Sequence, residues 1–260
     1  MYKAQNFLGR YTQKLYYQDV FLSSCVAKIV KIVENKIEVD QTVAYPEGGG
    51  QEGDIGTIKS ESGTVIRFSD TQKLYGRKLY LDEFPSINVE TIIHHIICDD
   101  DVHLLSSFSE GDTVVVSINT QRREKLSISH SASHLVFVGV SEVMPEVVKN
   151  VKGCHIDENS ARFDFYVKRR FTQDDVAKIQ AMANSMVKEN HVINSYHHPE
   201  ELEAWYWEAN GHVIPCGGTH LKSTSVIGEI FVKRKNIGKN LERIILTFPN
   251  AVVDESSYHG

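Results

Sequence analysis

The sequence has no long apolar run, and its first residues are polar. No stretch approaches the roughly 20 apolar residues of a membrane-spanning helix. Residues 1–20 also lack the apolar centre of a secretory signal peptide. We therefore expect a cytoplasmic protein.

Cysteine is scarce. The four cysteines lie far apart and form no CxxC pair: Cys25, Cys98, Cys154 and Cys216. In a chain without a signal peptide, this pattern predicts free thiols or metal ligands rather than a disulfide framework.

Positive charge is also in deficit, because 28 Lys and Arg residues face 34 Asp and Glu residues, a net charge of -6. Bulk electrostatics will therefore not hold the molecule on nucleic acid, and any RNA contact has to come from a local basic patch. Three clusters qualify, at residues 122–125, 168–170 and 233–235. Each could equally be a solvated edge.

A length of 260 residues suits two domains. In the first predicted domain, residues 1–119, short alternating or β-branched runs separated by turn residues predict a small β-barrel. A hairpin turn is expected at Glu34-Asn35, and the polar stretch 119–125 is the predicted hinge. The other expected strands are residues 57–60, 64–69, 88–98 and 113–118.

The second predicted domain, residues 120–260, has helical periodicity over residues 126–144. Thr172 followed by Asp175 has the form of a capping box, which predicts a second helix to about Asn190. Helices on a mostly antiparallel sheet make this an α+β fold. The remaining expected elements are strands at 161–167 and 191–196, a short helix after residue 199 and a hairpin over 228–248.

Two histidines, His130 and His134, stand four residues apart in the first predicted helix. Positions i and i+4 share one helix face, so both imidazoles can reach one metal ion. Cys216 and His220 repeat the spacing in PCGGTH, a tight and adaptable loop. Either pair alone is weak evidence, since most such residues lie on helix surfaces, in cores or in loops. Together, three imidazoles and one thiolate suit Zn2+.

The stretch from Tyr45 to Gln51, YPEGGGQ, cannot continue a strand, because three consecutive glycines follow a proline. We interpret it as a barrel turn or as backbone that closely approaches a ligand or another segment. The acidic run at residues 99–101 predicts a solvated loop rather than a metal site, since no partner ligands flank it.

The chain resembles the editing region of alanyl-tRNA synthetases in four motifs taken in order: PEGGGQ with Asp54 and Gly56, HSASH, GCHIDENSARFDF, and PCGGTH. A Gly-Glu-Ile and a Leu-Glu-Arg-Ile follow the last motif. Over residues 20–248 the chain is most similar to the AlaX trans-editing proteins, which are free-standing relatives of that region. Its length leaves no room for a class II aminoacylation domain as well, which favours a free-standing editor.

The resemblance implies a translation-factor-like β-barrel joined to the α+β editing domain of threonyl- and alanyl-tRNA synthetases. It also implies hydrolysis of the ester that joins a wrong amino acid, serine or glycine, to tRNA(Ala). Such correction is needed because a pocket built for alanine rejects small differences poorly. The implied zinc ligands are His130, His134, Cys216 and His220.

The chain departs from that family in two places. It reads Val151-Lys-Gly-Cys154 where alanine-type editors commonly read Gln-x-Gly-Ser, and Ser133 stands where they often have Thr. These changes bear on substrate choice. We expect Ser133 to read a serine hydroxyl and Gln51 to support the metal ligands. Cys154 is expected to be a buried small side chain, and His212 a loop or core histidine.

The role of the zinc stays open at this point. Four protein ligands make a closed, structural site, whereas three leave a position for a water that attacks the ester, aided by the metal or by the ribose hydroxyl. A zinc peptidase is disfavoured, because Ser131 stands where HExxH has its glutamate base. A non-catalytic tRNA-binding module held together by zinc is the alternative function.

Overall fold

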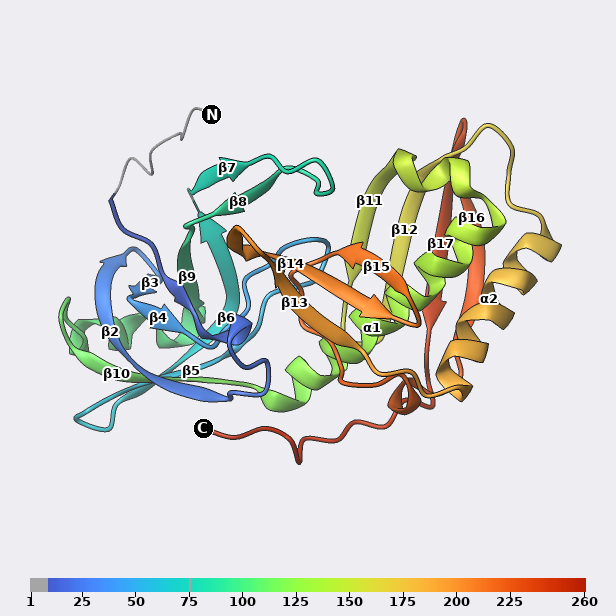
Figure 1. The fold of residues 1–260 in the computed structure, drawn as a ribbon. Helices are drawn as coiled ribbons and strands as arrows, with labels where there is room; N and C mark the ends of the chain where they lie inside the picture. Colours follow the sequence, from blue (N-terminus) through green and yellow to red (C-terminus); the bar gives the residue numbers. More distant parts are fainter. Residues whose placement is uncertain (1–8, 75) are drawn as a thin grey trace.

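The computed structural model describes residues 9–74 and 76–260. The chain is an α+β protein, with a β-barrel at one end and a helix-covered sheet at the other (Figure 1). The barrel interior and the space between helices and sheet hold two separate hydrophobic clusters. None of the described helices combines the length and apolarity needed to cross a bilayer.

The barrel closes through six strands in the order β10-β2-β3-β9-β6-β5, and every neighbouring pair is antiparallel. In β10, Val114 and Val116 are buried and Val115 is exposed, so the period-two alternation fills the interior. The barrel strands are β2 (Ser24–Val33), β3 (Lys36–Val39), β5 (Gly56–Ser60), β6 (Val65–Leu74), β9 (Ile92–Ile97) and β10 (Thr113–Ile118).

Short elements surround the barrel. The first and fourth strands form a parallel pair, and the seventh and eighth form a hairpin. These elements are β1 (Gln13–Lys14), β4 (Gln41–Thr42), β7 (Arg77–Leu79), β8 (Ile87–Val89) and the 3-10 helices η1 (Leu15–Tyr17) and η2 (Asp99–Ser107).

The second half places two helices against a four-stranded antiparallel sheet of order β11-β12-β17-β16, with a three-stranded sheet, β13-β14-β15, beside them (Figure 1). Its helices are α1 (Thr120–Val143), α2 (Gln173–Lys188), η3 (Pro145–Asn150) and η4 (Ser225–Ile227). Its strands are β11 (Val151–Ile156), β12 (Ser160–Tyr166), β13 (Asn194–His198), β14 (Glu201–Ala209), β15 (His212–Pro215), β16 (Phe231–Gly238) and β17 (Leu241–Thr247).

The predicted hinge at residues 119–125 is wrong, because these residues form the first turns of α1. Asn119 caps the helix by accepting a hydrogen bond from the Arg122 amide at 2.9 Å. The Arg123 side chain is fully buried and its Nε donates to Asp54 at 3.0 and 3.1 Å. The polar sequence resembled a linker, but Arg122 and Arg123 form ion pairs with Glu52 and Asp54 of the barrel half.

Other predicted elements had mixed outcomes. The hairpin turn at Glu34-Asn35, the capping box of α2 and the C-terminal hairpin β16–β17 are confirmed. The short helix after residue 199 is wrong, because the segment forms strand β14. The single strand at 88–98 is divided between β8 and β9 by Glu90, whose φ is 54°. The acidic run 99–101 begins η2, and its Asp101 is buried against Arg67 at 2.8 Å.

Segments of the two halves reach across to one another. The loop between β7 and β8 meets the three-stranded sheet. There the Tyr206 hydroxyl donates to Glu83 at 2.9 Å, and the Tyr206 ring packs on Phe84. At the other side the C-terminal tail returns to the barrel half, where His259 pairs with Leu22 (Figure 1). These contacts join the two halves at two separate places.

Candidate metal centre

The centre is built on α1, whose residues from Leu126 to Val136 are all buried. Such a helix would be apolar all round in a simple core, yet this one carries a row of buried serines and histidines. Buried polar groups need partners, and two serines of α1 find theirs in the loop that follows β15. Ser127 donates to the Thr219 hydroxyl at 3.0 Å, and Ser131 accepts from the Leu221 amide at 3.1 Å. The helix therefore holds the PCGGTH loop directly against its histidines.

Four side chains converge at this contact: His130, His134, Cys216 and His220. Their ligand atoms all lie within 4.8 Å of one another. The Sγ of Cys216 is 3.3 Å from His130 Nε2 and 3.6 Å from His220 Nε2. The Nε2 atoms of His134 and His220 are 3.1 Å apart. The predicted meeting of the two distant pairs is thus present in the structure.

This donor set fits a metal ion. In a tetrahedral zinc site with N and S ligands, the ligand atoms lie about 3.3 to 3.8 Å from one another, close to the three separations above. Burial lowers the pKa of His130 to about 3 and puts those of His134 and His220 well below their usual range. The imidazoles are therefore neutral, as metal ligation requires. Burial raises the pKa of the Cys216 thiol to about 11, a shift that a bound cation opposes.

Gln51, from the glycine-rich stretch of the barrel half, orients the first of these ligands. Its Oε1 lies 2.7 Å from His130 Nδ1 and also accepts from the Thr219 amide at 3.1 Å. Its Nε2 donates to the Thr219 hydroxyl at 3.0 Å, which makes Oε1 the acceptor. His130 must then carry its proton on Nδ1, so the Nε2 lone pair faces the cluster.

Gly218 permits this close approach. A Cβ at this position would lie 2.1 Å from His130 Cε1 and 3.0 Å from Gln51 Oε1, distances at which something must shift. Only a residue without a side chain lets the PCGGTH backbone pass over the imidazole. The two glycines of that loop were expected to make it tight, and this contact supplies the physical reason for one of them.

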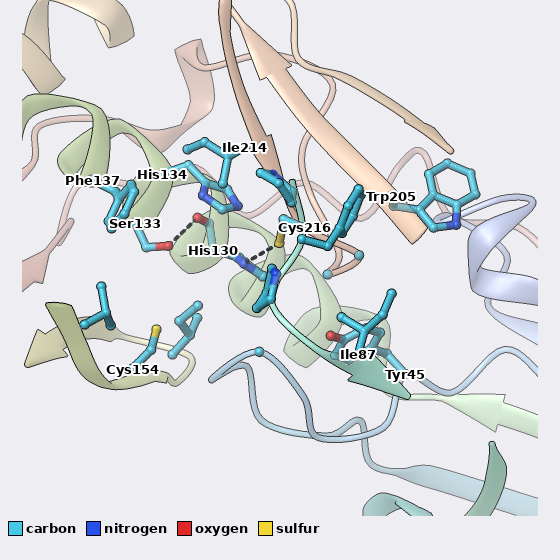
Figure 2. A pocket seen from close by; sticks show the side chains of 18 of the residues that line it. Tyr45, Ile87, His130, Ser133, His134, Phe137, Cys154, Trp205, Ile214 and Cys216 are labelled. Carbon is cyan, nitrogen blue, oxygen red and sulfur yellow. Dashed lines mark hydrogen bonds between the residues drawn. The ribbon is translucent and has the colours of Figure 1, made fainter. Parts of the chain in front are cut away.

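Three of the four candidate metal ligands, His130, His134 and Cys216, line a cavity of about 290 Å³ between the two halves (Figure 2). Most of the wall near His134 is apolar and comes from α1, β11, β12 and β15. The barrel half supplies the opposite side and the mouth. Lining residues of the first group are Phe137, Val151, Ile156, Phe163 and Ile214, and of the second Tyr17, Tyr45, Gly49, Lys73 and Ile87.

Of the other predicted site residues, Ser133 and Cys154 line the cavity and His212 lies outside the cluster. Ser133 lines the cavity, and its hydroxyl donates to the His130 carbonyl at 2.7 Å (Figure 2). Cys154, expected to be simply buried, also lines the cavity and is half-buried. His212 begins β15 and is not part of the four-residue cluster. The four cysteines are free thiols, as expected.

Sequence reasoning missed the residues that tie the two ligand pairs together. Thr219 receives hydrogen bonds from both Ser127 and Gln51, and it lies between two of the ligands in the chain. A signal for the helix contribution was present, because Ser127 and Ser131 are also four residues apart, next to HxxxH. Nothing local in the sequence pairs these serines with residues about 90 positions later.

Comparison with known proteins agrees with this geometry. Residues 197–245 match the family described as "Threonyl and Alanyl tRNA synthetase second additional domain". The matched region contains Cys216 and His220 but not the α1 histidines. The candidate metal centre therefore joins ligands inside the matched region to ligands more than 60 residues before it.

A wider similarity covers most of the chain. It is 31% identical over 242 residues to the alanine–tRNA ligase of Sulfurisphaera tokodaii, covering 84% of this chain and 24% of the relative. Identity to the ligase of Methanosphaera stadtmanae is 28% over 254 residues, or 90% and 26% of the two chains. For Pyrococcus furiosus it is 29% over 274 residues, or 94% and 26%. This chain spans about a quarter of the length of these relatives. It is therefore similar to one part of an alanine–tRNA ligase, not to the whole ligase.

Proposed function

We propose that this protein hydrolyses the ester bond of misacylated tRNA(Ala), with serine or glycine as the wrong amino acid, and that it depends on Zn2+ at His130, His134, Cys216 and His220. The observation that carries the proposal is the meeting of four candidate metal-ligand side chains, three of which line a cavity formed by both halves. Similarity to alanine–tRNA ligases over most of the chain supports tRNA as the substrate class.

The cavity suits a small aminoacyl group. Phe137, Phe163 and Ile214 give it an apolar wall that limits size and keeps bulk water away from the ester. Ser133 donates to a helix carbonyl, so its oxygen still has lone pairs to accept a hydrogen bond from a serine hydroxyl. This arrangement favours serine over alanine, because alanine has no group to satisfy Ser133.

The chain's own residues also prepare the reacting end. Gln51 holds His130 in the tautomer that presents Nε2, and Thr219 fixes Gln51 in turn. Bound Zn2+ supplies Lewis-acid stabilisation of negative charge on the ester oxygen. The attacking water would be activated by the Lewis acidity of that ion or by the neighbouring ribose hydroxyl of the substrate.

A second function is favoured by one observation. All four donors point at a single position, and a zinc site with four protein ligands is usually closed and structural. In that case the protein is a zinc-stabilised tRNA-binding module without catalysis. The two-domain division at residues 119 and 120 and a cytoplasmic location remain parts of the proposal.

The test incubates the purified protein with Ser-tRNA(Ala), Gly-tRNA(Ala) and Ser-tRNA(Thr) and follows ester loss, with zinc content measured on the same sample. We expect one zinc per chain and hydrolysis of Ser-tRNA(Ala) that stops after chelation and returns with added zinc. Stoichiometric zinc and tRNA binding without ester loss would support the binding module instead. Absence of both zinc and ester loss would remove the proposal.

A further inference from the structure

The predicted basic patches are largely occupied within the protein. In the first, Arg122 pairs with Glu52 and Glu158, and Arg123 is buried against Asp54. In the second, Arg169 pairs with Asp175 and Arg170 with Glu242, and in the third Arg234 pairs with Glu242. Cations held in this way are poor candidates for binding a phosphate, since the existing pair must first be broken. Among the described residues Lys168, Lys233 and Lys235 have no ion pair, but none of them lines the cavity.

Lys73, at the end of β6, is different. It lines the same cavity as the candidate metal ligands. Its ammonium group rests on the glycine-rich stretch, because a Cβ at Gly48 would lie 2.5 Å from its Nζ. Within residues 9–74 and 76–260 no carboxylate lies within ion-pair distance of this ammonium, and solvent reaches the side chain.

The acidic residue of the cavity wall, Glu203, is already held by other groups, so the Lys73 ammonium can bind an added anion. Glu203 is held by Lys14 at 2.6 Å and by the Glu90 amide at 3.1 Å. Desolvation lowers the pKa of Lys73, and the charge of Lys14 lowers it further, whereas Glu203 and Glu47 oppose this shift. An additional negative group at the ammonium would relieve both unfavourable effects.

The neighbouring backbone offers donors at the same place. Gly48 and Gln51 exchange both backbone hydrogen bonds at 3.0 Å around a two-residue turn. Gly49 and Gly50 have φ values of 61° and 91°, which is the conformation of a type I′ turn. In the described chain neither of these two amides donates to another protein group, and Gly49 lines the cavity. The Gly49 amide is therefore a second donor available to an anion in this cavity.

We propose that Lys73, with the Gly49 turn, binds the phosphate on the 5′ side of the nucleotide whose ribose carries the aminoacyl ester. This inference rests on the proposed function, which places the ester at the metal centre. An aminoacyl group contributes a cationic amine, which Lys73 repels. The ribose and its 5′-phosphate follow next along the RNA, and the phosphate is the anion of that terminal nucleotide.

The experiment compares two hydrolysis-resistant ligands: 3′-amino-3′-deoxyadenosine joined to serine by an amide, with and without a 5′-phosphate. Binding is measured by calorimetry on the zinc-loaded wild type and on Lys73→Met. We expect the wild type to bind the phosphorylated ligand about tenfold more tightly, as one charged hydrogen bond warrants. Lys73→Met should bind both ligands equally, whereas Lys73→Arg should keep most of the preference.

Lys59→Met, an exposed lysine of β5 on the barrel, is the matched control and should keep the full preference. A wild type without any preference, a failure to bind either ligand, or a preference that survives in Lys73→Met would each overturn the assignment. Because binding needs no turnover, these results are separate from ester hydrolysis, whose absence in the wild type removes the proposed function instead. With Ser-tRNA(Ala), Lys73→Met should raise KM, leave kcat unchanged and reduce the salt dependence by about one phosphate contact.

Discussion

The buried histidine of the barrel and the three buried histidines of the metal centre differ in what their ring nitrogens contact. In the barrel, His95 is fully buried and packs on Phe68, yet both ring nitrogens already have protein partners: Thr42 at 2.9 Å and the Ile37 carbonyl at 3.2 Å. At the metal centre, His130, His134 and His220 direct nitrogens at one another and at a thiol. Burial lowers the pKa of the histidines in both places. What distinguishes the metal centre is therefore not burial but ring nitrogens that face one another and a thiol, where a metal ion could bind them.

The strongest test of this difference replaces one residue of the metal centre and, separately, the buried histidine of the barrel. We expect Cys216→Ala and His134→Ala to lose bound zinc and to lower deacylation more than about 100-fold, since each deletes a ligand. His95→Gln should retain one zinc per chain and near-normal activity. Elemental analysis after dialysis and initial rates with Ser-tRNA(Ala) measure both. A Cys216→Ala protein with full zinc and activity would refute the distinction.

The buried ion pair between α1 and the barrel half predicts the next largest effect. Asp54→Asn leaves the fully buried Arg123 without its charged partner, which should cost about 3–5 kcal/mol of unfolding free energy. Urea unfolding measures this loss. Lys178→Met is the control, because its pair with Asp174 on the surface of α2 is exposed and should be worth less than about 0.5 kcal/mol. Equal effects of the two changes would show that the buried pair does not hold the halves together.

A pH titration tests the barrel histidine alone. Burial lowers the pKa of His95 from 6.5 to about 4, so the folded chain favours the neutral ring. Its stabilising contribution is therefore fully present above pH 6.5 and is lost as the pH falls toward 4. Between pH 7 and pH 4 the wild type should lose roughly 3 kcal/mol more than His95→Gln. Parallel unfolding curves for the two proteins over this range would contradict that account.

The smallest expected effect concerns the orientation of a ligand. Gln51→Ala removes the acceptor for His130 Nδ1, so the ring loses its enforced tautomer. We expect zinc affinity to fall about 10–100-fold, measured by competition with a chelator. Gln72→Ala, which removes surface hydrogen bonds to Glu47 and Asp70, should leave the affinity unchanged. If both variants bind zinc like the wild type, Gln51 does not set the tautomer.

Local patterns identified much of the fold because they are short-range. Alternation in Val114, Val115 and Val116 reports a strand with one buried face, and the Thr172 to Asp175 box reports a helix start. The same reasoning failed at Arg123, where a polar residue suggests a linker unless its buried partner Asp54 is known. It also failed after residue 199, where β14 is a strand because it pairs with β13 and β15 on its two sides. Tertiary pairing overrides local preference in both cases.

The sequence by itself determined the four candidate metal ligands, since HxxxH and CxxxH state both their identity and their spacing. It also indicated that the glycines of YPEGGGQ form a turn or bring the backbone close to a ligand or another segment. Only the tertiary structure decided that the two pairs meet, that Gln51 from the barrel half sets the tautomer of His130, and that Lys73 lines the cavity without an ion pair among the described residues. The physical reason is that the contacts of the metal centre join residues 79 to 168 positions apart, and they exist only after α1 has packed against the barrel half and the PCGGTH loop.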